Sequence, residues 1–247
     1  MKYRETYIHS QEQWLEDVFM FTVPDENGEA ALPGQFYMLK WTDDLPLMRP
    51  ISIFKQEKQL LSFVYRVVGD GTRRLSLLEK GAPISLLGPL GIGFPCENVS
   101  GQVALVGGGV GIPPLYETAK VLNKKNIQTD IFLGFKDRPF GVEDFAVINK
   151  RLFLASEDKI TGCYHGRITD LVQVENYNAV FTCGPEPMMY TLLCRCREKG
   201  IPVWLSMEKR MGCGIGACLV CNCETRHGMM KTCTDGPVFS GADIIVS

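Results

Sequence analysis

The chain has 247 residues, 45% of them hydrophobic, and a formal net charge of -2 at pH 7. The length suits one large domain or roughly two to three small ones. The near-neutral charge gives no electrostatic basis for binding nucleic acid, and no apolar run approaches the roughly 18 residues of a membrane span. The amino terminus, MKYRETYIHS, lacks an apolar signal core. We therefore expect a cytoplasmic protein, in which disulfides are rare.

Residues 1–97 predict a small antiparallel β-barrel. The runs FYMLKW, PISIF, LLSFVYRVV and PISLLG are rich in β-branched and aromatic residues, and DENG, GDG and EKGAP separate them as turns. The segment RPIS joins Arg49 to Ser52 at the start of a strand. Without further context, an arginine at such a position most often makes an ion pair on the surface.

Residues 98–203 predict an α/β domain with a parallel sheet. QVALVGGGVGIPPLYETAKVLNKKN predicts a strand, a glycine turn and a helix. QTDIFLGF, RLFLAS and NAVFTCGP predict further strands, and EPMMYTLLCRCREKG predicts a helix after the last of them. Strands and helices that alternate at this length indicate parallel strands.

Two loops of this domain are candidate ligand sites. Gly109, Gly111 and Pro114 form G-x-G-x-x-P between a strand and a helix, where glycines let a pyrophosphate approach the helix N-terminus. The alternative is a tight turn without a ligand, since the dinucleotide fingerprint ends in glycine rather than proline. Residues 183–185 follow the last strand, at the edge where ligands bind in open α/β sheets. A plain strand-to-helix turn is the alternative there.

Residues 204–247 are rich in cysteine and glycine and too few to build much of a core, so they need a staple such as a metal centre. Cys213, Cys218 and Cys221 follow C-x4-C-x2-C, and Cys233 comes after eleven intervening residues. This is the plant-type spacing of [2Fe–2S] ligands. The interleaved glycines accept positive φ and leave room beside a cluster.

Other interpretations of these cysteines stay open. Structural zinc sites more often use two short C-x2-4-C pairs, and the thiols could also be inert. Cys223 could replace Cys221, but C-x4-C-x4-C fits the plant-type pattern less well. We expect the remaining thiols to be small buried hydrophobes: Cys96, Cys163, Cys183, Cys194 and Cys196.

The motifs together resemble the ferredoxin–NADP reductase superfamily, in which a flavin-binding barrel precedes a nicotinamide domain. In that superfamily R-x-[YF]-[ST] binds flavin, with the arginine on phosphate and the hydroxyl near the ring. RPIS matches it, except that Ile51 replaces the aromatic residue. The G-x-G-x-x-P and C-G-P motifs of the superfamily match the two loops described above, at Gly109, Gly111, Pro114, Cys183, Gly184 and Pro185.

The order of the three segments, with RPIS, YRVVGDGT, GPLGIGF, MGCGIGACLVC and CTDGPVF, resembles the electron-transfer subunits of class 1B dihydroorotate dehydrogenases over essentially the whole chain. The resemblance implies a multi-domain protein with a flavin barrel at 1–97, a nicotinamide domain at 98–203 and a cluster domain at 204–247. It implies FAD contacts from Arg49, Pro50, Ile51, Ser52, Val64, Tyr65, Arg66, Gly71 and Thr72. It also implies nicotinamide contacts from the two loops, Cys183 as the catalytic residue, and cluster ligands Cys213, Cys218, Cys221 and Cys233.

In that family a partner subunit oxidises dihydroorotate with FMN, in pyrimidine biosynthesis, and two of each chain assemble. Electrons would pass from FMN through the cluster and FAD to NAD+, because FAD can accept single electrons and deliver a pair. One alternative is a related reductase subunit of a hydrogenase or a ferredoxin:NADP system, and another is a non-catalytic metal-binding module. No acid–base set is evident, and the three histidines, His9, His165 and His227, are expected to be solvated or structural.

Two finer expectations concern specificity and partner contact. Asp137, in GFKDRPF, predicts NAD over NADP because it would repel a 2′-phosphate, although Lys136 and Arg138 beside it could attract one. The apolar residues of the cysteine loop are expected to contact the partner or to support that contact. The alternative is that they pack on this chain's own nicotinamide domain. These residues are Met211, Ile215 and Leu219.

Overall fold

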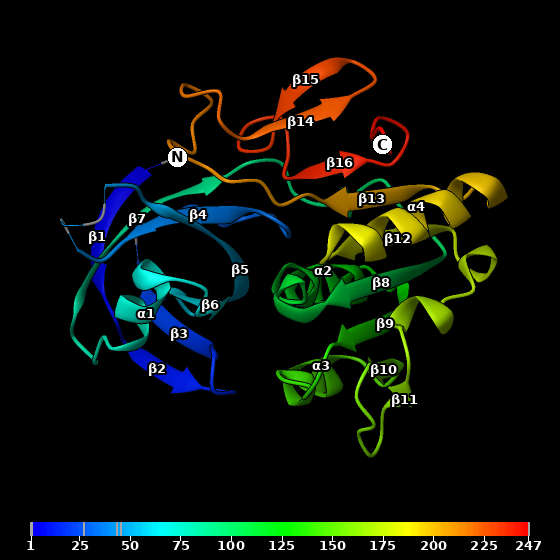
Figure 1. Cartoon of the computed structure of the whole chain (residues 1–247), viewed down its shortest axis with the longest axis horizontal. Coiled ribbons are helices and arrows are strands. Elements are labelled where there is room, and N and C mark those ends of the chain that lie inside the picture. The colour runs from blue at the N-terminus through cyan, green and yellow to red at the C-terminus, as the bar shows by residue number, and fades with distance from the viewer. Residues whose placement is uncertain (1, 27, 43, 45, 247) are drawn as a thin grey trace.

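The computed structural model describes residues 2–26, 28–42, 44 and 46–246. Two seven-stranded sheets lie side by side, and a two-stranded hairpin lies across them at the top of Figure 1. Within the described ranges, no helix is long and apolar enough to cross a membrane.

The first sheet curls into an antiparallel half-barrel, as predicted for the amino-terminal segment. Its strands run in the order β1-β7-β4-β5-β6-β3-β2. Aromatic side chains such as Phe21 and Phe63, with ring centroids 5.3 Å apart, fill its interior. The strands are β1 (Lys2–Tyr7), β2 (Ser10–Gln13), β3 (Val18–Pro24), β4 (Phe36–Lys40), β5 (Arg49–Glu57), β6 (Leu60–Arg66) and β7 (Pro83–Leu90).

A short helix, α1 (Asp70–Ser76), belongs to this barrel although the segment was expected to be all β. Its one large buried side chain, Leu75, packs into the barrel interior. A helix of two turns with a single buried apolar side chain shows no helical periodicity in the sequence. Gly69 and Gly71, at its start, indicate a turn instead.

The second sheet has the order β11-β10-β9-β8-β12-β13-β16, and all its pairs are parallel except β13 with β16. The predicted parallel sheet is confirmed. The chain order reverses between β8 and β12, which makes a topological switch point. The elements are β8 (Gln102–Gly108), α2 (Pro113–Lys124), β9 (Gln128–Phe135), α3 (Val142–Ile148), β10 (Leu152–Ser156), β11 (Tyr164–His165), β12 (Ala179–Cys183), α4 (Glu186–Lys199), β13 (Val203–Ser206) and β16 (Val238–Ser240).

The carboxyl-terminal segment adds a strand to the second sheet. Its hairpin joins β14 (Asn222–Thr225) to β15 (Gly228–Lys231), and β16 then pairs with β13. The sequence-based boundary at 203/204 falls inside β13. The carboxyl-terminal segment is too small to build a core of its own. Its buried residues Val238 and Phe239 instead pack in the core of the α/β domain, so the two parts of the chain share one sheet.

The two large domains share one core. Phe54 on the outer face of β5 packs against Tyr116 of α2, with ring centroids 4.9 Å apart, and against Phe145 of α3. An ion pair between Lys55 and Asp144 spans the same interface. Because interiors are densely packed and resist deformation, this contact fixes how the barrel faces the second sheet.

Candidate functional site

Arg49 begins β5 and lies against the first turn of α1. A Cβ atom added to Gly71 would come within 3.1 Å of Arg49 Nη2 and 3.2 Å of its Nε. A side chain at position 71 would therefore crowd this guanidinium, which lies close against the helix backbone. Arg49 also donates a hydrogen bond to the carbonyl of Leu47. A guanidinium next to backbone N–H groups suits a phosphate.

The neighbouring motif residues have different roles. Thr72 Oγ1 accepts the N–H groups of Val68 (2.9 Å) and Gly69 (3.2 Å), so this hydroxyl shapes the loop in front of α1. Ile51 packs inside the barrel with Leu75 and is 9% exposed. It therefore offers no aromatic face to a flavin. Pro50 and Ser52 are half-buried and alternate with Ile51 along β5.

In β6, side chains alternate between two surroundings. Val64 packs in the core shared with the α/β domain, whereas the Tyr65 ring lies inside the barrel and stacks on Phe19 at 5.7 Å. Burial raises the pKa of Tyr65 well above its usual value. Arg66 at the strand end pairs with Asp17 at 3.3 Å. A cofactor over this strand would meet its backbone and the Val64 side.

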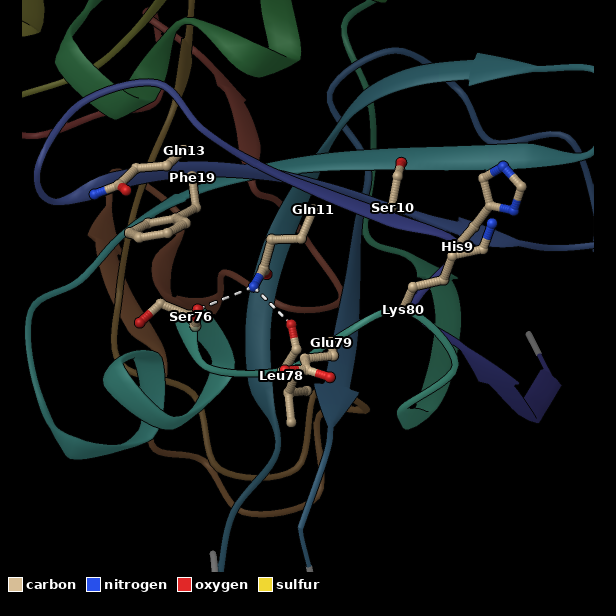
Figure 2. Close-up of a pocket in the computed structure, with 9 residues that line it drawn as sticks. All are labelled: His9, Ser10, Gln11, Gln13, Phe19, Ser76, Leu78, Glu79 and Lys80. Atoms are coloured by element: carbon tan, nitrogen blue, oxygen red, sulfur yellow. Dashed lines mark hydrogen bonds between the residues drawn. The ribbon is translucent and has the colours of Figure 1, made fainter.

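Gln11 of β2, which the sequence did not single out, ties α1 to the barrel (Figure 2). Its Nε2 donates to the carbonyls of Leu75 (3.3 Å), Ser76 (3.1 Å) and Leu78 (3.0 Å), and its Oε1 accepts the Tyr65 hydroxyl at 3.3 Å. These carbonyls lie in the last turn of α1 and just after it, where helix carbonyls run short of backbone partners; that of Leu75 also accepts the N–H of Leu78 at 3.1 Å. Gln11 thereby holds the helix that carries Gly71 against Arg49. A single glutamine in an exposed polar strand gives no sequence signal for this role.

The two glycine loops meet at the switch point between β8 and β12. A Cβ on Gly111 would lie 2.6 Å from the carbonyl oxygen of Cys183, and one on Gly184 would lie 2.9 Å from the backbone nitrogen of Gly108. Gly184 also has φ of +151°. Gly109–Gly111 form a 3-10 turn before α2. The buried Pro114 lies in the first turn of α2, and the exposed Pro185 precedes α4. The structure thus brings both predicted nicotinamide motifs together.

Cys183 ends β12 opposite Ser206 of β13. It shares a sheet face with Phe181, which stacks on Phe94 at 5.0 Å on the side of the sheet that faces the barrel. Burial raises the pKa of the Cys183 thiol to about 12, although the Ser206 hydroxyl acts in the opposite direction. At neutral pH this group is a protonated thiol, so it can donate a weak hydrogen bond but is not an activated nucleophile.

In the loop that begins at Cys213, backbone N–H groups point at the sulfur atom of Cys213. Cys213 Sγ accepts the N–H groups of Ile215 and Cys218, each at 3.4 Å. Burial would raise the pKa of Cys213, but these N–H groups and that of Ala217 lower it to about 7. Gly214 has φ of +74° and lies against Met38 of β4, where an added Cβ would be 2.5 Å from Met38 Cγ. The loop therefore curls around its sulfur and is seated on the barrel.

The four expected ligands lie together as two pairs. The Cys213 thiol lies beside that of Cys218, and the Cys221 thiol beside that of Cys233, while Cys213 and Cys233 are near enough for their charges to interact. Burial and then Cys221 raise the pKa of Cys233 to about 11. Within the described ranges, no three Cys, His, Asp or Glu side chains form a single-ion site. A [2Fe–2S] core takes two thiolates at each iron, so two pairs fit it, and its positive iron would stabilise thiolates that otherwise repel.

Cys223 lies apart from these pairs. It is buried in the core under the hairpin with Met189 and Phe239, on the α/β side. Burial raises its pKa, and its charged neighbours there are Lys209 and Glu186. Cys221, only two residues earlier, instead packs on the barrel side.

None of the three apolar residues of the cysteine loop is among the side chains that pack in the core of the α/β domain. Met211 is half-buried against the barrel side chains Phe36 and Met38. Ile215 and Leu219 are 47% and 58% exposed. The three histidines lie apart from these motifs: His9 borders the recess of Figure 2, His165 is exposed in β11, and His227 pairs with Asp243 at 3.0 Å.

A curled antiparallel barrel joined to a parallel sheet, with glycine loops that meet at its switch point, defines the fold of the ferredoxin–NADP reductase type. The comparisons with known proteins agree. Residues 208–245 match the family model described as the iron–sulfur cluster binding domain of dihydroorotate dehydrogenase B. The chain is 45% identical over 216 residues to the dihydroorotate dehydrogenase B (NAD(+)) electron transfer subunit of Clostridium acetobutylicum, covering 87% of each chain. This chain belongs to the family of dihydroorotate dehydrogenase B electron transfer subunits.

Two further relatives cover nearly the whole chain. The corresponding subunit of Clostridium perfringens is 38% identical over 246 residues, which cover 99% of this chain and 98% of that one. Among solved structures, a chain of the NADH-dependent reduced ferredoxin–NADP oxidoreductase, studied for flavin-based electron bifurcation, superimposes with a TM-score of 0.86. It is 28% identical, with 97% of this chain and 89% of that chain covered.

Proposed function

We propose that this chain is an electron-transfer subunit that passes electrons from a dihydroorotate-oxidising partner through a [2Fe–2S] cluster and FAD to NAD+. One observation carries the proposal. The loop that holds Cys213, Cys218 and Cys221 is seated on β4 of the barrel, at Gly214 and Met38, next to the β5 strand that carries the flavin motif. A one-electron centre held by these thiols would lie against the domain that would carry the flavin.

The chain's own residues have distinct tasks in this scheme. Arg49, beside Gly71, would bind the FAD phosphates, and the loops at Gly109–Gly111 and 183–185 would bind the nicotinamide nucleotide. Cys183 keeps its proton on Sγ and faces the barrel from the sheet edge. FAD, when bound, supplies the chemistry that converts single electrons into a hydride. The shared aromatic core holds the two binding domains in a fixed relation.

We propose that the partner is an FMN-bearing catalytic subunit of pyrimidine biosynthesis, with two of each chain assembled in the cytoplasm. The names of the relatives support a multi-subunit dehydrogenase. The exposed apolar residues beside the paired cysteines support the place of contact: Ile215, Leu219 and Val220, with exposed fractions of 47%, 58% and 59%. A cluster at this position would receive electrons directly across such an interface.

Reconstitution tests the partner proposal. We expect the isolated protein to oxidise NADH with artificial acceptors but not to reduce NAD+ with dihydroorotate, and the added FMN subunit to restore that reaction. Leu219→Asp should weaken the complex about tenfold or more, because it buries a charge in an apolar contact. Titration of the reconstituted activity against partner concentration measures the effect. Val147→Asp on α3, where Val147 is 86% exposed, is the matched control and should bind normally. Dihydroorotate-dependent NAD+ reduction by this chain alone would refute the two-subunit scheme.

A reductase subunit of a ferredoxin:NADP system is the second candidate, and the high structural similarity to the ferredoxin–NADP oxidoreductase chain favours it. The same assay separates the two candidates. Reduced ferredoxin would replace the FMN subunit as electron donor, and dihydroorotate with the FMN subunit would give no NADH.

Nicotinamide preference is a further expected result. Asp137 follows β9 with its side chain exposed, and its carbonyl accepts the Ser156 hydroxyl at 2.6 Å, which fixes the turn. Because like charges repel across a binding site, kcat/KM for NADH should exceed that for NADPH by about tenfold or more. Dye reduction with each nucleotide measures the two kcat/KM values. Asp137→Ala should lower the ratio of the value for NADH to that for NADPH. A preference for NADPH would show that Lys136 and Arg138 dominate this turn.

A further inference from the structure

The hairpin places one buried hydroxyl group beside the paired cysteines. The register of β14 and β15 pairs Asn222 with Lys231, and the N–H of Thr232 donates to the carbonyl of Cys221 at 2.8 Å. The pairing therefore extends by one step, to Cys221 opposite Thr232. Residues that face each other in an antiparallel pair project from the same face, with Cβ atoms about 4.5–5.5 Å apart. The Thr232 side chain thus lies on the same face as the Cys221 thiol.

This hydroxyl has no hydrogen-bond partner of its own. Thr232 is fully buried, and Thr232 Oγ1 makes no hydrogen bond to any described residue. Leaving a buried hydroxyl unpaired costs about 1–3 kcal/mol, and buried polar groups in native proteins are nearly always paired. Two of the four cysteines are next to it by register and by sequence, since Cys221 faces Thr232 across the hairpin and Cys233 follows it in the chain. A sulfur acceptor that carries charge would satisfy the hydroxyl.

We propose that the Thr232 hydroxyl donates a hydrogen bond to the cluster that the four cysteines hold, at the Cys221 sulfur or an adjacent sulfide, and that it raises the cluster's midpoint potential. The inference rests on the proposed iron–sulfur site. Reduction adds one electron to the cluster, and the Thr232 proton stays on its oxygen. The added negative charge strengthens the hydrogen bond, so the bond favours the reduced form.

The structure offers a matched control for the loss of a buried hydroxyl. Thr182 in β12 is also fully buried, with an unpaired Oγ1, but it belongs to the second sheet between Val106 and Leu205. Thr182→Val removes a buried hydroxyl that does not neighbour any of the four expected cluster ligands. A general effect of buried hydroxyls on packing would appear in both variants, whereas a hydrogen bond to the cluster would appear only at position 232.

Redox titration of the full-length protein, followed by the EPR signal of the reduced cluster, tests the proposal. In Thr232→Val the ratio of reduced to oxidised cluster at a fixed potential should fall about fivefold, which at 59 mV per tenfold is about 40 mV. Thr232→Ser keeps the donor and should titrate close to the wild type, as should Thr182→Val. The EPR g-values should move in Thr232→Val alone.

Each outcome bears on the proposal separately from the proposed function. If the wild type contains no iron or acid-labile sulfide, the iron–sulfur assignment itself fails. If Thr232→Val keeps a full cluster with an unchanged potential, only the hydrogen bond is refuted. If Thr232→Val does not assemble a cluster, the Ala and Ser variants at position 232 decide, because both lack the γ-methyl group and only serine retains the hydroxyl. Equal potentials in that pair would overturn the inference.

Discussion

Cys221→Ser should remove the [2Fe–2S] cluster, whereas Cys223→Ser should leave its content unchanged. Cys221 lies beside Cys233 on the barrel side of the hairpin, while Cys223 is buried under the hairpin on the α/β side. A cluster that depends on four thiolates loses a primary ligand in the first variant only. Iron and acid-labile sulfide should fall to background, and the visible absorption of the cluster should disappear while that of the flavin remains.

The other three expected ligands should behave like Cys221. Serine at position 213, 218 or 233 should each abolish or severely reduce the cluster, and serine at Cys196, which is fully buried in the α/β core, serves as a packing control. Circular dichroism separates cluster loss from unfolding. Full occupancy in Cys221→Ser combined with loss in Cys223→Ser would reverse the assignment of the third ligand.

Arg49→Ala should weaken FAD binding about 10- to 100-fold, because charge-assisted hydrogen bonds to phosphate contribute about 1.5–3 kcal/mol each. The guanidinium lies 3.1–3.2 Å from the position that a Cβ of Gly71 would take, at the turn that begins α1. Flavin retained after gel filtration and a fluorescence titration of the flavin-free protein both measure the loss. Gln11→Ala should produce a smaller loss, since it releases the end of α1 without removing the charge.

Arg73→Ala is the matched control, because Arg73 is an exposed arginine of the same helix. It should bind FAD like the wild type. The α/β domain of Arg49→Ala should stay folded, as judged by an unchanged cluster spectrum and circular dichroism. Normal FAD retention in Arg49→Ala would show that the RPIS segment does not bind the flavin phosphates.

Much of the architecture followed from the sequence because its signals are local. Alternating strand and helix patterns predicted the parallel sheet, and the runs of β-branched residues predicted the barrel. The glycine loops and the spacing of Cys213, Cys218 and Cys221 are likewise contained in short segments, where backbone conformation and reach limit which residues can serve. These features of the fold and of the candidate site can therefore be predicted without knowing which distant residues are in contact.

Other features depend on residues far apart in the chain, and only the tertiary structure decided them. The separation of Cys221 from Cys223 arises because the hairpin lies across both domains, so that thiols two residues apart meet different cores. The support of α1 by Gln11 joins residues more than 60 positions apart. The pairing of β16 with β13 and the unpaired hydroxyl of Thr232 are set by sheet register. Register and domain contact are properties of the packed chain, which composition and spacing do not encode locally.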